Sequence, residues 1–290
     1  MIRYSIVSTL CAGLFIAATI TTQFAVAQTV QREHGDNLYR PQVAQPGKDV
    51  IWVPTPDEVV ERMLRMAETS ASDIVYDLGA GDGKIAIMAA SKFGARATGV
   101  EFNPDMAALA QRNAQRAGVG DRARIIRGDI FETNFKDANV VTLFLLPSLN
   151  VKLRPTLLEM RPGTRVVSHA FDMDDWRADE VTRLDGRQMY LWIVPAKVQG
   201  RWRIDHPVRG RDAAFDLDIG QIYQRIEGDA TFGVMRSTIS GAQLRGESIA
   251  FSLMDAEGLR TDYAGIVKGN IIEGSARAGG RDYRFRAERR

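Results

Sequence analysis

The residues best suited to chemistry form a glycine-rich loop that directly follows a short apolar run. In IVYDLGAGDGKIAI, residues 74–87, three glycines follow Asp77 within six positions. The phosphate loop of nucleoside triphosphatases requires G-x-x-x-x-G-K-S/T, and the dinucleotide loop requires glycine where this chain has Lys84. Gly79 and Gly81 let a ligand come close to the backbone, because they carry no Cβ. Asp77 would repel a pyrophosphate and attract an ammonium group, so the loop predicts a ligand that carries an amine.

Two further carboxylates lie at the ends of the next predicted strands: Glu101 in TGVEFNP ends the second strand, and Asp129 in RGDIF follows the third. A tight strand–helix turn without a ligand would not account for them. Together with VYDLGAGDG they resemble the class I, seven-strand methyltransferases that use S-adenosylmethionine, over about residues 50–195. The resemblance implies that the loop and Asp77 hold the methionine end of this cofactor and that Glu101 accepts hydrogen bonds from both ribose hydroxyls. It also implies that Asp129 meets the exocyclic amine of adenine, while the next backbone N–H contacts the ring. The implied cofactor-binding residues are Asp77, Gly79, Ala80, Gly81, Gly83, Glu101, Phe102, Asp129 and Ile130.

A narrower resemblance concerns the region over the transferred methyl. The stretches WVPTP, DLGAGDGKIAI and LFLLPSLN are similar to a small branch of protein-lysine methyltransferases that modify the c-ring protein of ATP synthase and the adenine nucleotide carrier. That branch implies that the segment carrying Thr55 closes over the cofactor, although the Thr55 hydroxyl could equally cap the following helix. Methyltransferases of bases or glutamine amides carry Asn/Asp-Pro-Pro-Tyr/Phe where this chain has Leu145, Leu146, Pro147 and Ser148. This departure favours an amine acceptor over an amide or a base.

The chemistry of methyl transfer asks little of the side chains. A sulfonium already activates its methyl group, so positioning is the main contribution of the protein. A lysine acceptor, whose free pKa is about 10.4, must first lose a proton, and a desolvated pocket lowers that pKa. His169 in VVSHAF lies at the carboxyl end of a predicted strand, where open α/β sheets bind ligands. It is either functional or a structural hydrogen-bonding residue. DMDDW, residues 172–176, is either an acidic lip that attracts a basic substrate or a solvated turn.

Predicted strands and helices alternate between residues 51 and 196, which indicates an α/β fold with a doubly wound, mostly parallel sheet. The strands are expected at 74–78, 96–101, 123–127, 139–145 and 164–170. The first helix is expected to start at a Thr55-Pro56-Asp57-Glu58 capping box. The other helices are expected from the glycine loop to near Gly94, from Asn103-Pro104 to Gly118, and over PSLNVKLRPTLLEM.

The pattern changes near residue 197. Short alternating runs such as FDLDI, ESIAFSLM and DYRFRAER are separated by Gly and Asp, which predicts a small antiparallel β barrel or sandwich over 197–290. In the last run, Tyr283, Phe285 and Ala287 are expected on one face. This domain shows no catalytic constellation. Its predicted role is structural or interaction-forming, and a lipocalin-like barrel with an apolar ligand is the alternative.

The N-terminus predicts export. One positive charge, an apolar stretch and an A-x-A site at Ala25 and Ala27 indicate a signal peptide over 1–27, with an uncleaved membrane anchor as the alternative. A polar lead segment, 28–50, follows. The expected location is the periplasm or cell envelope, with possible membrane association, or the cytoplasm if the signal is not used. Export is in tension with the predicted cofactor, because S-adenosylmethionine is made in the cytoplasm. Cys11, the single cysteine, lies in the signal, and no metal site is expected.

These features predict an S-adenosylmethionine-dependent methyltransferase that N-methylates a protein amine, with lysine as the expected acceptor. The net charge of +2 is too small for a nucleic-acid footprint, so no nucleic-acid partner is expected. A protein substrate is what the narrower resemblance implies. The predicted catalytic residues are Thr55, Leu145, Leu146, Pro147 and His169. The alternative is a non-catalytic module that binds the cofactor or a nucleoside, with a β barrel that contacts a partner or lipid in the cell envelope.

Overall fold

The computed structural model describes residues 34–208 and 210–290. The predicted signal at 1–27 and the first residues of the predicted lead segment therefore lie outside the described residues. Among the helices of the described part, none has the length and apolar character needed to cross a bilayer.

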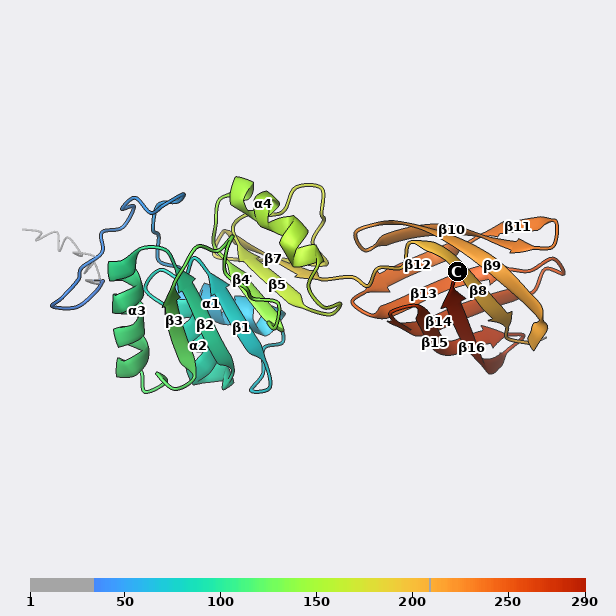
Figure 1. Cartoon of the computed structure of the whole chain (residues 1–290), viewed down its shortest axis with the longest axis horizontal. Helices are drawn as coiled ribbons and strands as arrows, with labels where there is room; N and C mark the ends of the chain where they lie inside the picture. The colour runs from blue at the N-terminus through green and yellow to red at the C-terminus, as the bar shows by residue number, and fades with distance from the viewer. Residues whose placement is uncertain (1–33, 209) are drawn as a thin grey trace, which may run out of the picture. The chain divides into compact units, whose positions relative to one another are not determined.

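A first sheet of seven strands is ordered β3-β2-β1-β4-β5-β7-β6 (Figure 1). Its strands are β1 Ile74–Leu78, β2 Arg96–Glu101, β3 Ala123–Arg127, β4 Val140–Leu143, β5 Arg165–His169, β6 Glu180–Leu184 and β7 Arg187–Ile193. Neighbours among β1 to β5 pair in parallel, whereas β7 runs antiparallel to both β5 and β6. The predicted α/β fold with a mostly parallel sheet is confirmed.

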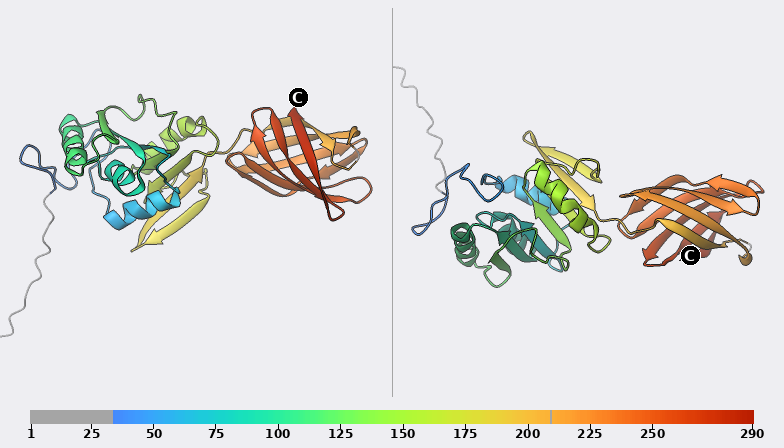
Figure 2. Two further views of the ribbon diagram at one scale, coloured as in Figure 1. Left: turned by 90° about the horizontal axis from the view of Figure 1, so that it is seen from below. Right: turned by 45° about the horizontal axis from the view of Figure 1, so that its top comes forward.

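Helices cover both faces of this sheet (Figures 1 and 2). They are α1 Asp57–Met66, α2 Lys84–Phe93, α3 Pro104–Arg116 and α4 Pro147–Leu158. Buried residues of α1 and α2 share one core with Val75 and Val167, and α4 packs Leu153 and Leu157 into a second core with Val141. Burying these apolar faces leaves the polar helix faces in solvent, as the helical spacing requires.

The start of α1 differs from its prediction. The helix begins at Asp57 with Pro56 at the N-cap position, and no side chain caps it. Thr55 lies one residue too early to cap, and its hydroxyl instead lies 3.5 Å from Nδ1 of His169. The predicted capping box is therefore wrong, because a tertiary contact takes the hydroxyl that the motif would use.

A second sheet contains nine strands, ordered β11-β10-β9-β8-β16-β15-β14-β13-β12, with antiparallel neighbours throughout. Its strands are β8 Gly200–His206, β9 Gly210–Ile222, β10 Arg225–Phe232, β11 Met235–Thr238, β12 Ser240–Arg245, β13 Ser248–Met254, β14 Arg260–Lys268, β15 Ile271–Ala278 and β16 Arg281–Arg289.

This second sheet is curved and nearly closed (Figure 2). The two ends of the strand order, β11 and β12, are consecutive in the chain and are joined by Ile239, whose backbone N–H donates to the carbonyl of Gly228 on β10 at 2.8 Å. Because one sheet curves round a single core, it is barrel-like rather than a sandwich of two sheets. In β16, Phe285 and Ala287 are buried as predicted.

Candidate active site

A cavity of about 730 Å³ lies at the carboxyl ends of the parallel strands. This volume is within the range of roughly 300–1,000 Å³ that small-molecule sites show. Four groups of residues line it: the segment 45–55, the glycine loop, the residues that follow β2 and β3, and the residues that follow β4 and β5. Chain segments far apart in sequence meet here, because parallel strands bring their carboxyl ends to one edge of the sheet.

The glycine loop has left-handed backbone at Gly79 (φ +84°) and Gly81 (φ +55°). A Cβ on Gly81 would lie 2.6 Å from Nε1 of Trp52, and one on Gly79 would lie 2.9 Å from a methyl of Leu145. Both glycines are therefore required by backbone conformation and by close neighbours on the cavity side. Gly83 does not line the cavity. It is the left-handed N-cap of α2 and packs against Ala110, and its predicted cofactor contact stays a prediction.

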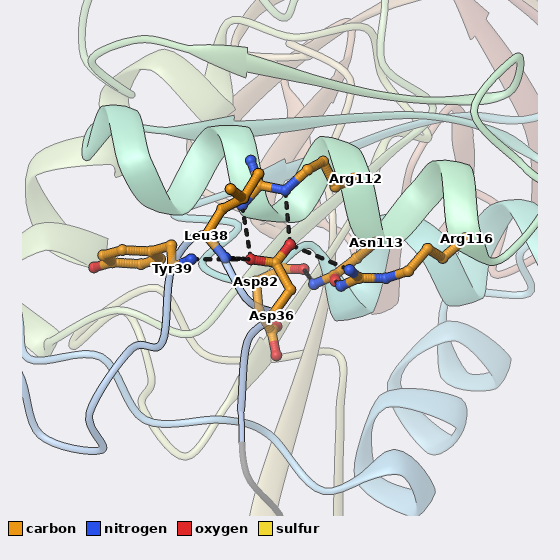
Figure 3. Close-up of polar contacts among 7 residues, drawn as sticks. All are labelled: Asp36, Leu38, Tyr39, Asp82, Arg112, Asn113 and Arg116. Carbon is orange, nitrogen blue, oxygen red and sulfur yellow. Dashed lines mark hydrogen bonds and ion pairs between the residues drawn. The ribbon is translucent and has the colours of Figure 1, made fainter.

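Helix α3 holds this loop in place (Figure 3). The side-chain amide of Asn113 donates to the carbonyl of Asp82 at 2.8 Å. On the same helix, Arg112 and Arg116 bind the carboxylate of Asp36, with nitrogen–oxygen distances of 2.7 and 3.1 Å. One helix thus positions both the glycine loop and the segment that leads into the cavity.

Glu101 and Asp129 lie in the cavity as predicted, with Phe102 and Ile130 beside them. The two oxygens of Glu101 accept from the backbone N–H groups of Gly81 (2.9 Å) and Asn103 (2.8 Å). Burial raises the pKa of Glu101, and these donors oppose that shift. Each carboxylate oxygen has a second acceptor position, so Glu101 can still accept from a ribose diol.

Asp77 lies beneath the glycine loop rather than in the cavity lining. Its Oδ1 accepts a hydrogen bond of 2.7 Å from the hydroxyl of Thr142, its register neighbour on β4. Its Oδ2 is buried and has no hydrogen-bond partner among the described residues. Burial raises the pKa of Asp77 to about 7. An unpaired buried carboxylate oxygen beside a glycine cradle fits a ligand that brings a cation, as the methionine end of S-adenosylmethionine does.

The other end of the cavity is apolar. Phe144, Leu145, Leu146, Leu149 and Phe171 line it. Leu145 is buried against Gly79, whereas Leu146 is 42% exposed at the start of α4. Pro147 and Ser148 are exposed and do not line the cavity, because the chain turns into α4 at this point. Leu145 and Leu146 thus line the cavity and Pro147 does not, and their predicted roles over the transferred methyl stay predictions.

His169 ends β5 and is buried behind Phe144, with ring centroids 4.1 Å apart. Burial, and secondarily the charge of Arg187, lower the pKa of His169 to about 4. The imidazole is therefore neutral at physiological pH. It lies beside Thr55, which lines the cavity, whereas His169 is not among the cavity-lining residues, and its predicted catalytic role stays a prediction.

Lys84 holds the segment that carries Thr55. Its ammonium donates to the carbonyl of Thr55 at 2.9 Å and pairs with Asp57 at 2.8 Å. From the sequence, Lys84 served only to exclude a dinucleotide-binding loop, and these contacts were not predicted. The cavity residues that the sequence prediction missed include Lys48, Trp52, Phe144 and Phe171. Of these four, only Phe144, an aromatic residue directly after β4, gives a sequence signal for the cavity. That signal does not say in which direction the side chain points.

The strand order, the glycine loop after β1 and the acidic residues after β2 and β3 define a class I methyltransferase that uses S-adenosylmethionine. The ANTKMT methyltransferase domain family matches residues 77–180. A protein-lysine N-methyltransferase from Saccharolobus islandicus is 46% identical over 151 residues, which are 50% of this chain and 94% of that protein. The chain belongs to the protein-lysine N-methyltransferase family.

Two other relatives define how far this similarity reaches. A mouse lysine N-methyltransferase that is named for the c-ring protein of ATP synthase is 34% identical over 132 residues, and the match spans about half of each chain, 45% of this one and 53% of that one. A crystal structure titled as an RNA methyltransferase from Salinibacter ruber, in complex with S-adenosyl-L-homocysteine, is 50% identical with a TM-score of 0.50. It covers 50% of this chain and 96% of that chain. The cofactor of the class is thus S-adenosylmethionine.

Proposed function

We propose that this chain transfers a methyl group from S-adenosylmethionine to the side-chain amine of a lysine in a protein. The observation that carries the proposal is the apolar end of the cavity, where Phe144, Leu145 and Phe171 adjoin the glycine loop. An amine that enters there leaves water, whereas a ligand bound along Glu101 and Asp129 keeps polar partners. The two lysine N-methyltransferases to which the chain is similar support the same acceptor.

The residues of this chain divide the work between binding and orientation. When bound, the cofactor supplies a methyl group activated by a sulfonium. Glu101 and Asp129 fix the nucleoside end through acceptor oxygens, and Asp77 provides negative charge beneath the loop. Leu145, packed on Gly79, closes the space beside the methionine end. Fixing the two reacting groups in this way is the main source of rate acceleration for such a transfer.

Desolvation, rather than a side-chain base, prepares the amine. A lysine ammonium has an ordinary pKa of about 10.4, and removal from water disfavours its charged form. His169 has a pKa of about 4, so its imidazole is too weak a base to hold a proton taken from a lysine. Its contact with Thr55 instead fixes the cavity wall. The aromatic faces of Phe144 and Phe171 can stabilise the cationic methylammonium product.

The rim of the cavity favours a basic protein segment over RNA. Asp172 and Asp174 are exposed directly after Phe171, which lines the cavity. Carboxylates at this position attract a lysine-containing segment and repel a phosphate backbone, because phosphate contacts dominate nucleic-acid affinity. Asp172 and Asp174 therefore lie where the proposed acidic lip could attract a basic substrate to the cavity.

The experiment supplies S-adenosylmethionine with a radiolabelled methyl to the purified protein and a proteome from the same cell. We expect label in a protein band, recovered as methyl-lysine after hydrolysis. Glu101→Ala should strongly reduce labelling at a limiting cofactor concentration, because loss of charge-assisted hydrogen bonds to the ribose costs about 1.5–3 kcal/mol of cofactor binding. The matched control is Glu180→Ala, which removes an exposed carboxylate on the edge strand β6.

Each alternative has its own outcome. Label in the RNA fraction would contradict a protein acceptor and favour a nucleic-acid substrate. Binding of S-adenosyl-L-homocysteine without label in protein, lipid, RNA or small-molecule fractions would favour the non-catalytic binding module. Unchanged cofactor affinity in Glu101→Ala, measured by calorimetry, would contradict the assigned cofactor site.

A further inference from the structure

A short hairpin overhangs the nucleoside end of the cavity. The N–H of Ala44 donates to the carbonyl of Trp52 at 2.8 Å, and the N–H of Trp52 donates to that of Gln45 at 3.0 Å. An isolated bridge joins Pro46 and Ile51. These contacts place Lys48 at the tip of the hairpin.

Contacts at both ends tether this hairpin. Upstream, the carboxylate of Asp36 binds Arg112 and Arg116 of α3, as Figure 3 shows. These hydrogen bonds hold the pKa of Asp36 far below its usual range. Downstream, Lys84 fixes the carbonyl of Thr55 just before α1 begins. The reach of Lys48 into the cavity therefore follows from the local fold.

The ammonium of Lys48 engages both features that would recognise adenine. It forms an ion pair with Oδ2 of Asp129 and lies 4.8 Å from the centroid of the Phe102 ring. Oδ1 of Asp129 accepts from the N–H of Phe131 at 2.9 Å. The ion pair raises the pKa of Lys48 and lowers that of Asp129. The carboxylate and the adjacent ring face are thus already occupied by a side chain of the same molecule.

We propose that Lys48 competes with the adenine of S-adenosylmethionine for this subsite and thereby sets the affinity of the enzyme for its cofactor. The Lys48 ammonium occupies the space beside Oδ2 of Asp129 that the exocyclic amine of adenine would enter, and the adenine ring needs the face of Phe102 that Lys48 covers. A neutral amine then replaces a cation beside the carboxylate. Part of the binding free energy of the cofactor is consequently used to break the Lys48 contacts. The inference rests on the cofactor and not on the lysine acceptor, so its failure would leave the proposed reaction untouched.

Calorimetry with S-adenosyl-L-homocysteine and the purified full-length protein tests the proposal. Lys48→Met removes the charge and keeps the length of the side chain, and we expect about 3- to 10-fold tighter binding because an exposed ion pair and a cation–π contact no longer compete. Lys48→Arg keeps both contacts and should bind like wild type. The matched control, Lys92→Met, breaks the ion pair with Glu61, which lies outside the cavity, and should leave affinity unchanged. Added salt should narrow the difference between wild type and Lys48→Met, because it screens the ion pair.

Equal or weaker binding by Lys48→Met would overturn the proposal, since Lys48 would then be neutral or a ligand of the cofactor. A second measurement uses the unmodified protein. Amine acetylation read by mass spectrometry should label Lys48 faster when S-adenosyl-L-homocysteine is present, because the ammonium is released from Asp129. Slower labelling of Lys48 with the ligand would overturn the proposal, and the acetylation rate of Lys92 provides the internal reference.

Discussion

The carboxylate of Asp77 is the least compensated charge among the described residues of the site. Only one of its oxygens has a hydrogen-bond partner, the hydroxyl of Thr142, and the side chain is 2% exposed. Burial holds its pKa at about 7, with Asp82 and Glu101 adding to the shift. A cation from a ligand would favour the ionised form. Asp77 therefore couples cofactor binding to protonation.

We expect S-adenosyl-L-homocysteine to displace a proton from Asp77 when it binds. Near pH 7 about half of the ligand-free carboxyls are protonated, so binding should release a fraction of a proton, and affinity should rise as the pH increases through 7. Calorimetry in buffers of different ionisation enthalpy measures this release. Asp77→Asn, which cannot ionise, should abolish it. Equal proton release by wild type and Asp77→Asn would assign the proton to another group.

Asp77 also makes the free energy of unfolding depend on pH, with the opposite sign to that of a carboxylate in an ion pair. Its folded pKa of about 7 lies above the ordinary value of 3.8, so the folded state holds a proton that the unfolded chain has lost. The Asp77 contribution to the free energy of unfolding should therefore fall as the pH rises from about 4 to above 7. Urea unfolding of wild type and Asp77→Asn without ligand measures this, and Asp77→Asn should gain relative stability across that interval. A constant difference would contradict the buried charge.

Residue-scale prediction succeeded where a local motif fixes the side chain. Glu101 is the last residue of β2 and Asp129 lies two residues after β3, so their position at the sheet edge could be predicted. Lys48 could not, because its partner Asp129 lies 81 positions away and no periodicity links the two. Thr55 satisfied the letters of a capping motif, but its hydroxyl lies beside a residue 114 positions away.

At the scale of elements, α2 depends on the backbone of Gly83. This residue is left-handed, with φ +83°, and a Cβ there would lie 3.0 Å from Cβ of Ala110 on α3. Gly118, just after α3, is also left-handed, with φ +69°, but has open space around the position of a Cβ. Substitution of Gly118 therefore tests backbone conformation alone, whereas substitution of Gly83 tests backbone conformation and helix packing together.

Gly118→Ala should lower the free energy of unfolding by about 1–2 kcal/mol, the cost of a left-handed residue that carries a Cβ. Gly83→Ala should lose at least about 1 kcal/mol more, because the added methyl overpacks α2 against α3. Urea unfolding of both variants, with wild type as the reference, measures the difference. Equal losses would show that α3 moves away without cost.

Strands of the first sheet were predictable where they alternate with helices along the chain. β1, β2 and β3 have the predicted bounds, and β4 and β5 are shorter than predicted by one or two residues at each end. The sequence pattern did not predict β6 and β7. β6 is an exposed edge strand, with Val181 53% exposed, so it has neither a continuous apolar run nor a strict alternation.

At the scale of the whole molecule, two separate cores serve two sheets. Trp202, Phe215 and Phe251 belong to the core of the barrel-like sheet, whereas α1, α2 and α4 pack on the first sheet. The predicted domain boundary between 196 and 197 falls between β7 and β8, and it stays a prediction. Buried side chains fill the described interior of the barrel-like sheet, which disfavours a ligand there. A role in substrate docking is the remaining proposal for this sheet.

A chain that ends at Ala196 tests that proposal. Every described residue of the cavity lies before this point, so S-adenosyl-L-homocysteine should bind as tightly as it binds the full chain. Label transfer to the protein substrate should fall, because the docking surface is absent. Calorimetry and the radiolabel assay measure the two effects separately. Equal transfer by both chains would exclude the docking role.

The proposed export of the protein also has a direct measurement. If the A-x-A site at Ala25 and Ala27 is cleaved, mass spectrometry of protein from its native host should find a chain that starts at Gln28. A full-length chain in the soluble cytoplasmic fraction would contradict export.

The position of Trp52 against the glycine loop makes its fluorescence a probe of ligand binding in the cavity. Trp176, Trp192 and Trp202 are fully buried, whereas Trp52 is half-buried with its indole nitrogen directed at Gly81. Collisional quenching by acrylamide should therefore act mainly on the emission of Trp52. A ligand that enters the cradle changes the surroundings of this indole and leaves the other three unaltered. Intrinsic fluorescence can thus follow occupancy in real time, without a label and without a methyl acceptor.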